Sequence, residues 1–96
     1  MAYQRYYTQA FNWYLKAAKQ GYADAENNVG FAYENGQGVP QDYVQAYMWF
    51  DLAAAQNVTA AASFRDSLEL LMTPEQLAQA QQLATQWAQQ HPAGNQ

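Results

Sequence analysis

This 96-residue chain contains no cysteine, no isoleucine and few charged side chains. The absence of cysteine excludes a disulfide framework, a thiolate nucleophile and a cysteine-based zinc site. Strands favour β-branched residues, and these are scarce here, since the chain has only four valines and no isoleucine. Nineteen alanines, fifteen glutamines and seven leucines are instead good helix formers. The composition therefore predicts an all-α fold in one small domain.

Positive charge is also scarce, with four basic residues against eight acidic ones and a net charge of −4. Nucleic acid and anionic lipid surfaces are excluded as leading partners, because no cationic patch is available to neutralise phosphates. No apolar run approaches the roughly 18 residues of a membrane helix, and the segment after Met1 has no signal-peptide core. We therefore expect no membrane insertion, and the compartment stays open between the cytoplasm and, for a processed chain, the periplasm.

The chain repeats itself with a period of 36 residues. The aligned pairs are Tyr7 with Tyr43, Ala10 with Ala46, Trp13 with Trp49, Tyr14 with Phe50, Ala17 with Ala53, and Gln20 with Gln56. Gly21 aligns with Asn57, and both residue types readily adopt the left-handed conformation that ends a helix. The repeat predicts one copy at about 7–42 and a second, incomplete copy at about 43–72.

Apolar spacing and capping signals predict five helices. These are expected at about residues 3–20, 23–35, 42–56, 59–71 and 74–90. Asp42 and Gln45 have capping-box spacing at the third helix, and Thr73, Pro74 and Gln76 form the clearest start signal at the fifth. We expect residues 1–92 to form the domain, with 74–90 as a C-terminal capping helix and 93–96 as a disordered tail.

Small residues alternate with aromatic residues along the predicted helices. Alanines such as Ala10 and Ala46 let backbones approach closely, and large rings fill the remaining space. We expect the rings between successive helix pairs to be Trp13, Tyr14, Trp49 and Phe50. This alternation favours αα-hairpins stacked as a solenoid, because a single hairpin cannot bury both of its faces.

A family resemblance begins at Ala10–Gly21, with the sequence AFNWYLKAAKQG. It continues through Ala23, Ala25, Val29, Gly30, Tyr33, Gly36, Gln37, Gly38, Val39, Asp42, Ala46 and Trp49. Over about residues 7–57 the chain resembles the Sel-one-like repeat family, a branch of the tetratricopeptide-like superfamily. The resemblance implies a right-handed αα superhelix that scaffolds protein complexes, often in bacterial envelope or signalling systems, without a common catalytic site. The chain differs from complete repeats in opening with the second helix of a repeat.

Candidates for catalysis or metal binding are few. His91 is the only imidazole and is expected to be an exposed tail residue, and Ser67 lacks a nucleophile-elbow pattern. Asp24, Glu26 and Glu34 lie on or beside one predicted helix, where the helix dipole accounts for the acidic first turn more simply than a cation site does. We therefore predict no catalytic residue, no cofactor and no metal site.

Candidates for partner binding lie where the repeat pattern leaves positions free. Asn27, Phe31 and Glu34 follow at i, i+4 and i+7 of the second predicted helix, and the resemblance implies that such helices line the concave face. Phe31 either anchors a partner there or packs under the fourth helix. Tyr3 and Tyr7 either fold back on the domain or meet another chain, because the helix that covers them in a complete repeat is missing.

The sequence thus favours a non-enzymatic interaction module that binds a protein or peptide in a shallow groove. Two other interpretations stay open: a structural terminal piece of a longer array, and a hydrolase of the kind proposed for cysteine-rich relatives. Tyr3, Tyr7, Phe11 and Tyr14 are expected to form an apolar patch larger than monomers normally expose. We expect this patch to form a homodimer through the first helix or to receive a partner helix.

Overall fold

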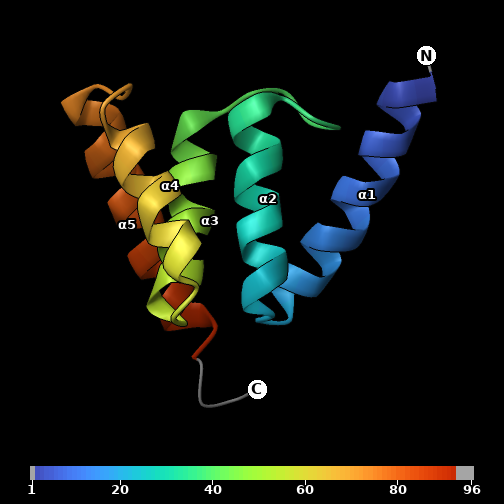
Figure 1. Cartoon of the computed structure of the whole chain (residues 1–96). Helices are drawn as coiled ribbons and strands as arrows, with labels where there is room; N and C mark the ends of the chain where they lie inside the picture. Colours follow the sequence, from blue (N-terminus) through green and yellow to red (C-terminus); the bar gives the residue numbers. More distant parts are fainter. Residues whose placement is uncertain (1, 93–96) are drawn as a thin grey trace.

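The computed structural model describes residues 2–92, which form five consecutive antiparallel helices (Figure 1). The helices are α1 (Ala2–Lys19), α2 (Ala23–Asn35), α3 (Tyr43–Ala55), α4 (Thr59–Glu69) and α5 (Pro74–Gln90). All five predicted helices are confirmed, with α2 and α5 at the expected bounds and the ends of the others within two residues of those expected. The tail expected at 93–96 lies outside the described residues.

The turns after α1 and α3 are copies of each other, as the 36-residue repeat predicts. Gly21 and Asn57 both have left-handed backbones, with φ of 93° and 72°. The amide of Tyr22 donates to the Ala17 carbonyl at 3.3 Å, and the amide of Val58 donates to the Ala53 carbonyl at 3.1 Å. Residue types with the same backbone preference, glycine and asparagine, therefore give the same turn at equivalent positions.

Side-chain caps start the third and fifth helices. Asp42 Oδ1 accepts from the Gln45 amide at 3.1 Å. At α5 both bonds of a capping box are present, because Thr73 Oγ1 accepts from the Gln76 amide at 3.1 Å and Gln76 Oε1 accepts from the Thr73 amide at 2.9 Å. These caps explain why the helix starts could be read from sequence.

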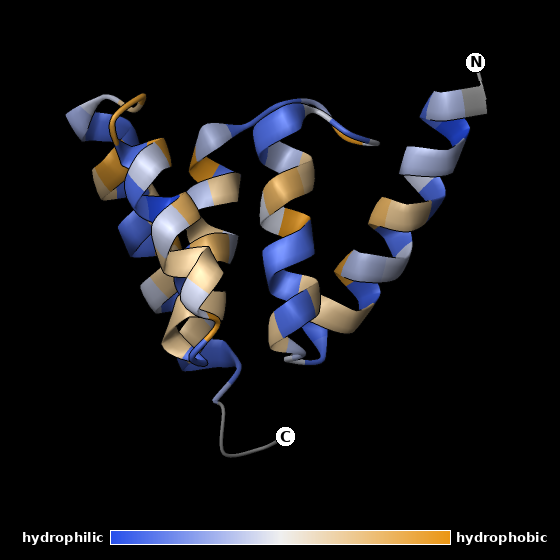
Figure 2. Ribbon diagram, in the orientation of Figure 1, coloured by the Kyte–Doolittle hydropathy of each residue, from blue (hydrophilic) through white to orange (hydrophobic). Residues whose placement is uncertain are grey.

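α3 is the central helix of the molecule, packed against α2, α4 and α5. Figure 2 shows hydrophobic residues on most of its ribbon, and every residue from Ala46 to Phe50 is buried. Trp49 joins a cluster with α1, α2 and α5, whereas Phe50 and Leu68 belong to a second cluster with α4 and α5. Two cores therefore meet on opposite faces of one helix.

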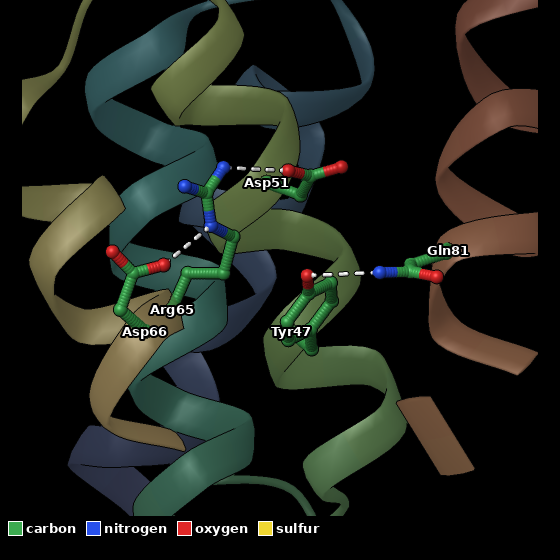
Figure 3. Close-up of polar contacts among 5 residues, drawn as sticks. All are labelled: Tyr47, Asp51, Arg65, Asp66 and Gln81. Atoms are coloured by element: carbon green, nitrogen blue, oxygen red, sulfur yellow. Dashed lines mark hydrogen bonds and ion pairs between the residues drawn. The ribbon is translucent and has the colours of Figure 1, made fainter. Parts of the chain in front are cut away.

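Polar contacts join α3 to both of its C-terminal neighbours (Figure 3). Arg65 of α4 donates to Asp51 at 2.8 Å and to its neighbour Asp66 at 3.2 Å. Gln81 of α5 lies 3.5 Å from the Tyr47 hydroxyl. Because the Arg65 and Asp51 side chains are 27% and 35% exposed, this pair contributes at most about 1 kcal/mol, and apolar packing dominates.

The environment of α1 differs from that expected. Trp13 and Tyr14 were predicted to fill the space between helix pairs, but they are 71% and 40% exposed. Their repeat equivalents Trp49 and Phe50 are 2% and 0% exposed. In Figure 1, α1 is inclined away from α2 towards its N-terminus, so among the described residues no helix covers this side of α1. The prediction for Trp13 was wrong because equivalent positions in the repeat do not have equivalent neighbours.

Candidate functional site

An open hollow of about 210 Å³ lies between α1 and α2. Its lining comprises Tyr6, Tyr7, Ala10, Phe11 and Tyr14 from α1, and Asn28, Phe31, Ala32 and Gln37 from α2 and the following loop. None of these side chains carries a charge at neutral pH. The hollow therefore offers aromatic and aliphatic walls, with carboxamide and phenol groups as its hydrogen-bonding atoms.

The α1 side of the hollow is an aromatic stripe. Tyr6 is 66% exposed and lies edge-on to the half-buried Tyr7, with ring centroids 5.6 Å apart. Phe11 was predicted to be part of the exposed patch, but it is 7% exposed and packs edge-on against Tyr33 of α2 at 5.4 Å. The face of α1 that carries Phe11 is thus closed onto α2, whereas the rings of Tyr6 and Tyr14 stay exposed at the hollow.

Phe31 forms the opposite wall of the hollow and has one of the two positions expected for it. Its ring lies 4.8 Å from Phe64 of α4 and 6.2 Å from Phe50 of α3, so it packs under the fourth helix. The residue nevertheless keeps 38% of its surface exposed and lines the hollow. The Phe31 ring therefore belongs both to the core and to the wall of the hollow.

The remaining predicted residues lie outside this hollow. Asn27 and Glu34 are half-buried on α2, and Tyr3 is 75% exposed at the start of α1. The buried Oδ1 of Asn27 has no hydrogen-bond donor, and burial raises the pKa of the Glu34 carboxyl. The structure brings Phe31 and Tyr7 together in one site but does not bring these three residues into it.

Sequence reasoning missed Asn28, Ala32 and Gln37 as lining residues. Asn28 and Ala32 are related by i, i+4 and lie on the side of α2 that faces α1. Residues with that spacing share a helix face, so the pattern could have indicated two of the three. Gln37 lies in the loop after α2, where no periodicity applies.

Glu26 is an unexpected buried carboxyl group at 3% exposure. Gln56 Nε2 donates to Glu26 Oε1 at 2.8 Å and lies 3.2 Å from the Gly21 carbonyl oxygen. Burial raises the Glu26 pKa to about 7, although the bond from Gln56 lowers it in part. The helix dipole interpretation was therefore incomplete, because this residue also joins the start of α2 to the end of α3.

A second open hollow, of about 340 Å³, lies over α3 between α1 and α5. Leu15, Met48, Trp49 and Trp87 are among its lining residues. Its rings are already engaged, since Trp49 packs edge-on against Trp87 at 4.8 Å. The two tryptophan rings of this surface are thus packed against each other, and the buried Nε1 of Trp49 has no hydrogen-bond acceptor among the described residues.

The candidates for chemistry are placed apart from the aromatic hollow. His91 ends α5, stacks on Trp87 with centroids 3.8 Å apart, and its Nδ1 lies 3.0 Å from the Trp87 carbonyl oxygen. Ser67 is exposed on α4. Residues 2–92 contain no cluster of metal-ligating side chains, and no helix among them is long and apolar enough to cross a membrane.

These features define a helical-repeat solenoid of antiparallel helix pairs with an open aromatic surface at one end. The chain belongs to the Sel1 repeat family, whose model matches residues 7–22 and 23–58. This match confirms the resemblance seen in the sequence. Sel1 repeats are protein-interaction modules.

Two relatives share part of this sequence. DAP3-binding cell death enhancer 1 of Rattus norvegicus is 45% identical over 42 residues, which cover 44% of this chain and 8% of that protein. Chitin synthase regulator SKT5 of Malassezia restricta is 38% identical over 61 residues, which cover 64% of this chain and 4% of that protein. The chain thus spans less than a tenth of either relative.

A solved structure shares the fold over most of the chain. The crystal structure of c5321, a protective antigen present in uropathogenic Escherichia coli strains and displaying an SLR fold, superposes with a TM-score of 0.85 at 37% identity. The match covers 88% of this chain and 18% of that protein. It confirms the predicted all-α repeat fold.

Proposed function

We propose that this chain is a non-enzymatic interaction module that binds a protein segment in the hollow between α1 and α2. The observation that carries this proposal is that Tyr14 and Phe31 line one uncharged hollow while remaining 40% and 38% exposed. Exposed apolar surface gathered in a concave site is typical of binding surfaces. The names of the relatives, a regulator and a DAP3-binding protein, are consistent with a binding role.

The proposed contacts divide into a centre and a rim. Tyr7 and Phe31 line the hollow and supply the central apolar contacts. Asn27, Glu34 and Tyr3 lie beyond the lining, so they contribute only to a partner that extends past it. Rim contacts of this kind contribute less than central ones.

Self-association is the second form that this binding can take. A homodimer through α1 would cover the exposed rings of Tyr3, Tyr6 and Tyr14. Light scattering coupled to gel filtration at micromolar concentration distinguishes a dimer from the 10.8 kDa monomer. A Tyr7→Ser, Tyr14→Ser double variant should return any dimer to a monomer.

Two alternative functions make different predictions. A terminal structural piece without its own ligand predicts that no partner contacts the hollow. A hydrolase predicts turnover of a broad substrate panel that His91→Ala or Ser67→Ala abolishes. The stacked position of His91 on Trp87 does not favour the second alternative.

Site-specific photocrosslinking in cells tests the interaction module. A benzophenone amino acid replaces Tyr14 inside the hollow or, as a matched control on the same helix, Trp13 outside it. We expect a discrete protein adduct from position 14 and none from position 13. The absence of any adduct from position 14 would contradict binding in the hollow and favour the structural alternative.

A further inference from the structure

The packing of α2 on α3 and α4 shows how a helix occupies a site of this kind. α2 lies on α3, and its Phe31 ring packs against Phe50 of α3 at 6.2 Å and Phe64 of α4 at 4.8 Å. Gly30 lets α2 approach closely, because a Cβ atom there would lie 2.7 Å from the Phe50 ring. Gly30 followed by Phe31 is thus the residue pair through which α2 packs against α3 and α4.

The 36-residue repeat relates the site that Phe31 contacts to the hollow between α1 and α2. Subtracting 36 from Phe50 gives Tyr14, and subtracting 36 from Phe64 gives Asn28. Both Tyr14 and Asn28 line the hollow between α1 and α2. The hollow is therefore the repeat equivalent of the place that Phe31 fills, and among the described residues no ring fills it.

We infer that the occupant is an amphipathic α-helix of a partner protein, lying on α1 and α2 as α2 lies on α3 and α4. This inference rests on the proposed function and names the partner's chemistry. The partner helix presents glycine or alanine immediately before an aromatic anchor. The anchor enters between Tyr14 and Asn28, and the small residue faces Tyr14.

Volume and charge specify the anchor further. A volume of about 210 Å³ is below the range of sites that hold whole small molecules, but it suits one large side chain. Asn28 replaces Phe64 at the equivalent position, so this wall is smaller and carries hydrogen-bonding groups. An anchor with a polar edge, such as tyrosine or tryptophan, is therefore favoured over phenylalanine. A charged residue is disfavoured, because the uncharged lining offers it no counterion.

A second copy of this chain is a poorer occupant. Within its helices the rings that follow glycine or alanine, apart from the terminal Tyr3, are Phe11, Phe31, Tyr33 and Tyr47. Phe11 and Tyr33 pack on each other, Phe31 packs on Phe64, and Tyr47 is buried. All of these pairs except Ala2–Tyr3 are thus already used inside each copy, and the exposed Tyr3 lies at the start of α1 rather than inside a helix as Phe31 does, which favours a different polypeptide.

A peptide that copies residues 22–36 tests the inference on the intact chain. The peptide carries the glycine–phenylalanine pair of α2, and a second version carries tyrosine in place of the phenylalanine. Nuclear magnetic resonance titration should shift the side-chain amide signals of Asn28 and Gln37. Replacing the peptide glycine with leucine, or its phenylalanine with alanine, should weaken binding at least about tenfold.

Further variants distinguish a failure of the helix proposal from a failure of the proposed function. Tyr14→Ser in the chain should abolish the amide shifts, and Trp13→Ser should preserve them. A peptide with proline at its centre keeps most side chains but cannot form the helix. If that peptide binds equally well, the occupant is not a helix and the interaction function survives. A dimer that Tyr14→Ser dissociates would overturn the partner assignment in favour of a second copy.

An intramolecular version removes the dependence on peptide helicity. A second copy of residues 23–42 replaces residues 1–6 and is joined directly to Tyr7, which preserves the 36-residue register. We expect this graft to raise the thermal midpoint above that of the same graft carrying Phe31→Ala in the added copy. Equal midpoints would show that no anchor is seated between Tyr14 and Asn28, and would overturn the inference while leaving the photocrosslinking result intact.

Discussion

Glu26 is a carboxylic acid enclosed where α2 begins and α3 ends. Its pKa is raised from 4.5 to about 7 by burial, and Gln56 supplies its hydrogen bond. Between these two pH values the folded chain holds the proton more than the unfolded chain does. Stability from this residue is therefore fully present below pH 4.5 and falls as the pH rises to about 7.

We expect Glu26→Gln to remove this pH dependence, because the amide keeps a hydrogen-bond acceptor without a charge. The variant should match the parent at pH 4.5 and exceed it above pH 7 by at most about 3 kcal/mol. Urea unfolding followed by tryptophan fluorescence across this range measures the difference. Glu75→Gln on exposed α5 is the matched control, and equal slopes in all three proteins would contradict the assignment.

Gly30 has a packing role that helix propensity alone would not predict. Alanine stabilises a helix interior by about 1 kcal/mol relative to glycine, so propensity favours Gly30→Ala. A Cβ atom at this position would instead lie 2.7 Å from Cδ1 and Cε1 of Phe50, which is 0% exposed. The overlap cannot be relieved by rotating the ring into solvent.

We therefore expect Gly30→Ala to destabilise the fold by about 1–3 kcal/mol, the usual cost of overpacking. In a Phe50→Leu background the same substitution should cost less, because the smaller side chain leaves room. A double-mutant cycle by urea denaturation measures the coupling. Additive effects would show that the close contact does not govern this position.

α1 and α3 are copies in sequence but have different neighbours. Trp49 is 2% exposed and packs against Trp87, whereas Trp13 is 71% exposed and has Lys16 Nζ 5.8 Å from its ring centroid. A cation–π contact at an exposed site contributes only about 0.5–1 kcal/mol. The two equivalent tryptophans should therefore differ strongly in their contribution to stability.

We expect Trp49→Ala to cost about 3–5 kcal/mol, as is usual for truncating a buried ring. Trp13→Ala should change stability by no more than about 1 kcal/mol, the loss of its cation–π contact included. Urea unfolding followed by far-ultraviolet circular dichroism compares the two without depending on tryptophan fluorescence. Similar losses in both variants would contradict the different environments of α1 and α3.

The whole molecule has a gradient of protection from α3 outwards. Residues 46–50 are all buried, whereas Tyr3 and Tyr6 are 75% and 66% exposed. Both apolar clusters include residues of α3, but only one includes residues of α1. The N-terminal half of α1 should therefore open without unfolding the rest.

Hydrogen exchange measures this gradient. Among the amides with an i−4 carbonyl partner inside a helix, we expect those at residues 6–10 to exchange fastest and those at 47–52 to exchange slowest. Adding the peptide that copies residues 22–36 should slow exchange in α1 selectively. Uniform protection across all five helices would contradict the gradient.

Local signals in the sequence determined the helices and their order. The caps at Asp42 and Thr73, and the left-handed positions at Gly21 and Asn57, depend on bonds between residues a few positions apart. Such bonds form in the same way wherever the residues occur. The 36-residue period added the repeat architecture, because equivalent apolar positions can pack in equivalent ways.

Only the tertiary structure decided which equivalent residues are covered. It placed Phe11 inside and Trp13 outside, enclosed Glu26, and left a hollow at Tyr14. Burial depends on the helices that lie beside a residue, and neighbours distant in sequence leave no mark on its local pattern. For this reason the repeat predicted a shared shape for α1 and α3, while the tilt of α1 determined that the hollow between α1 and α2 stays open.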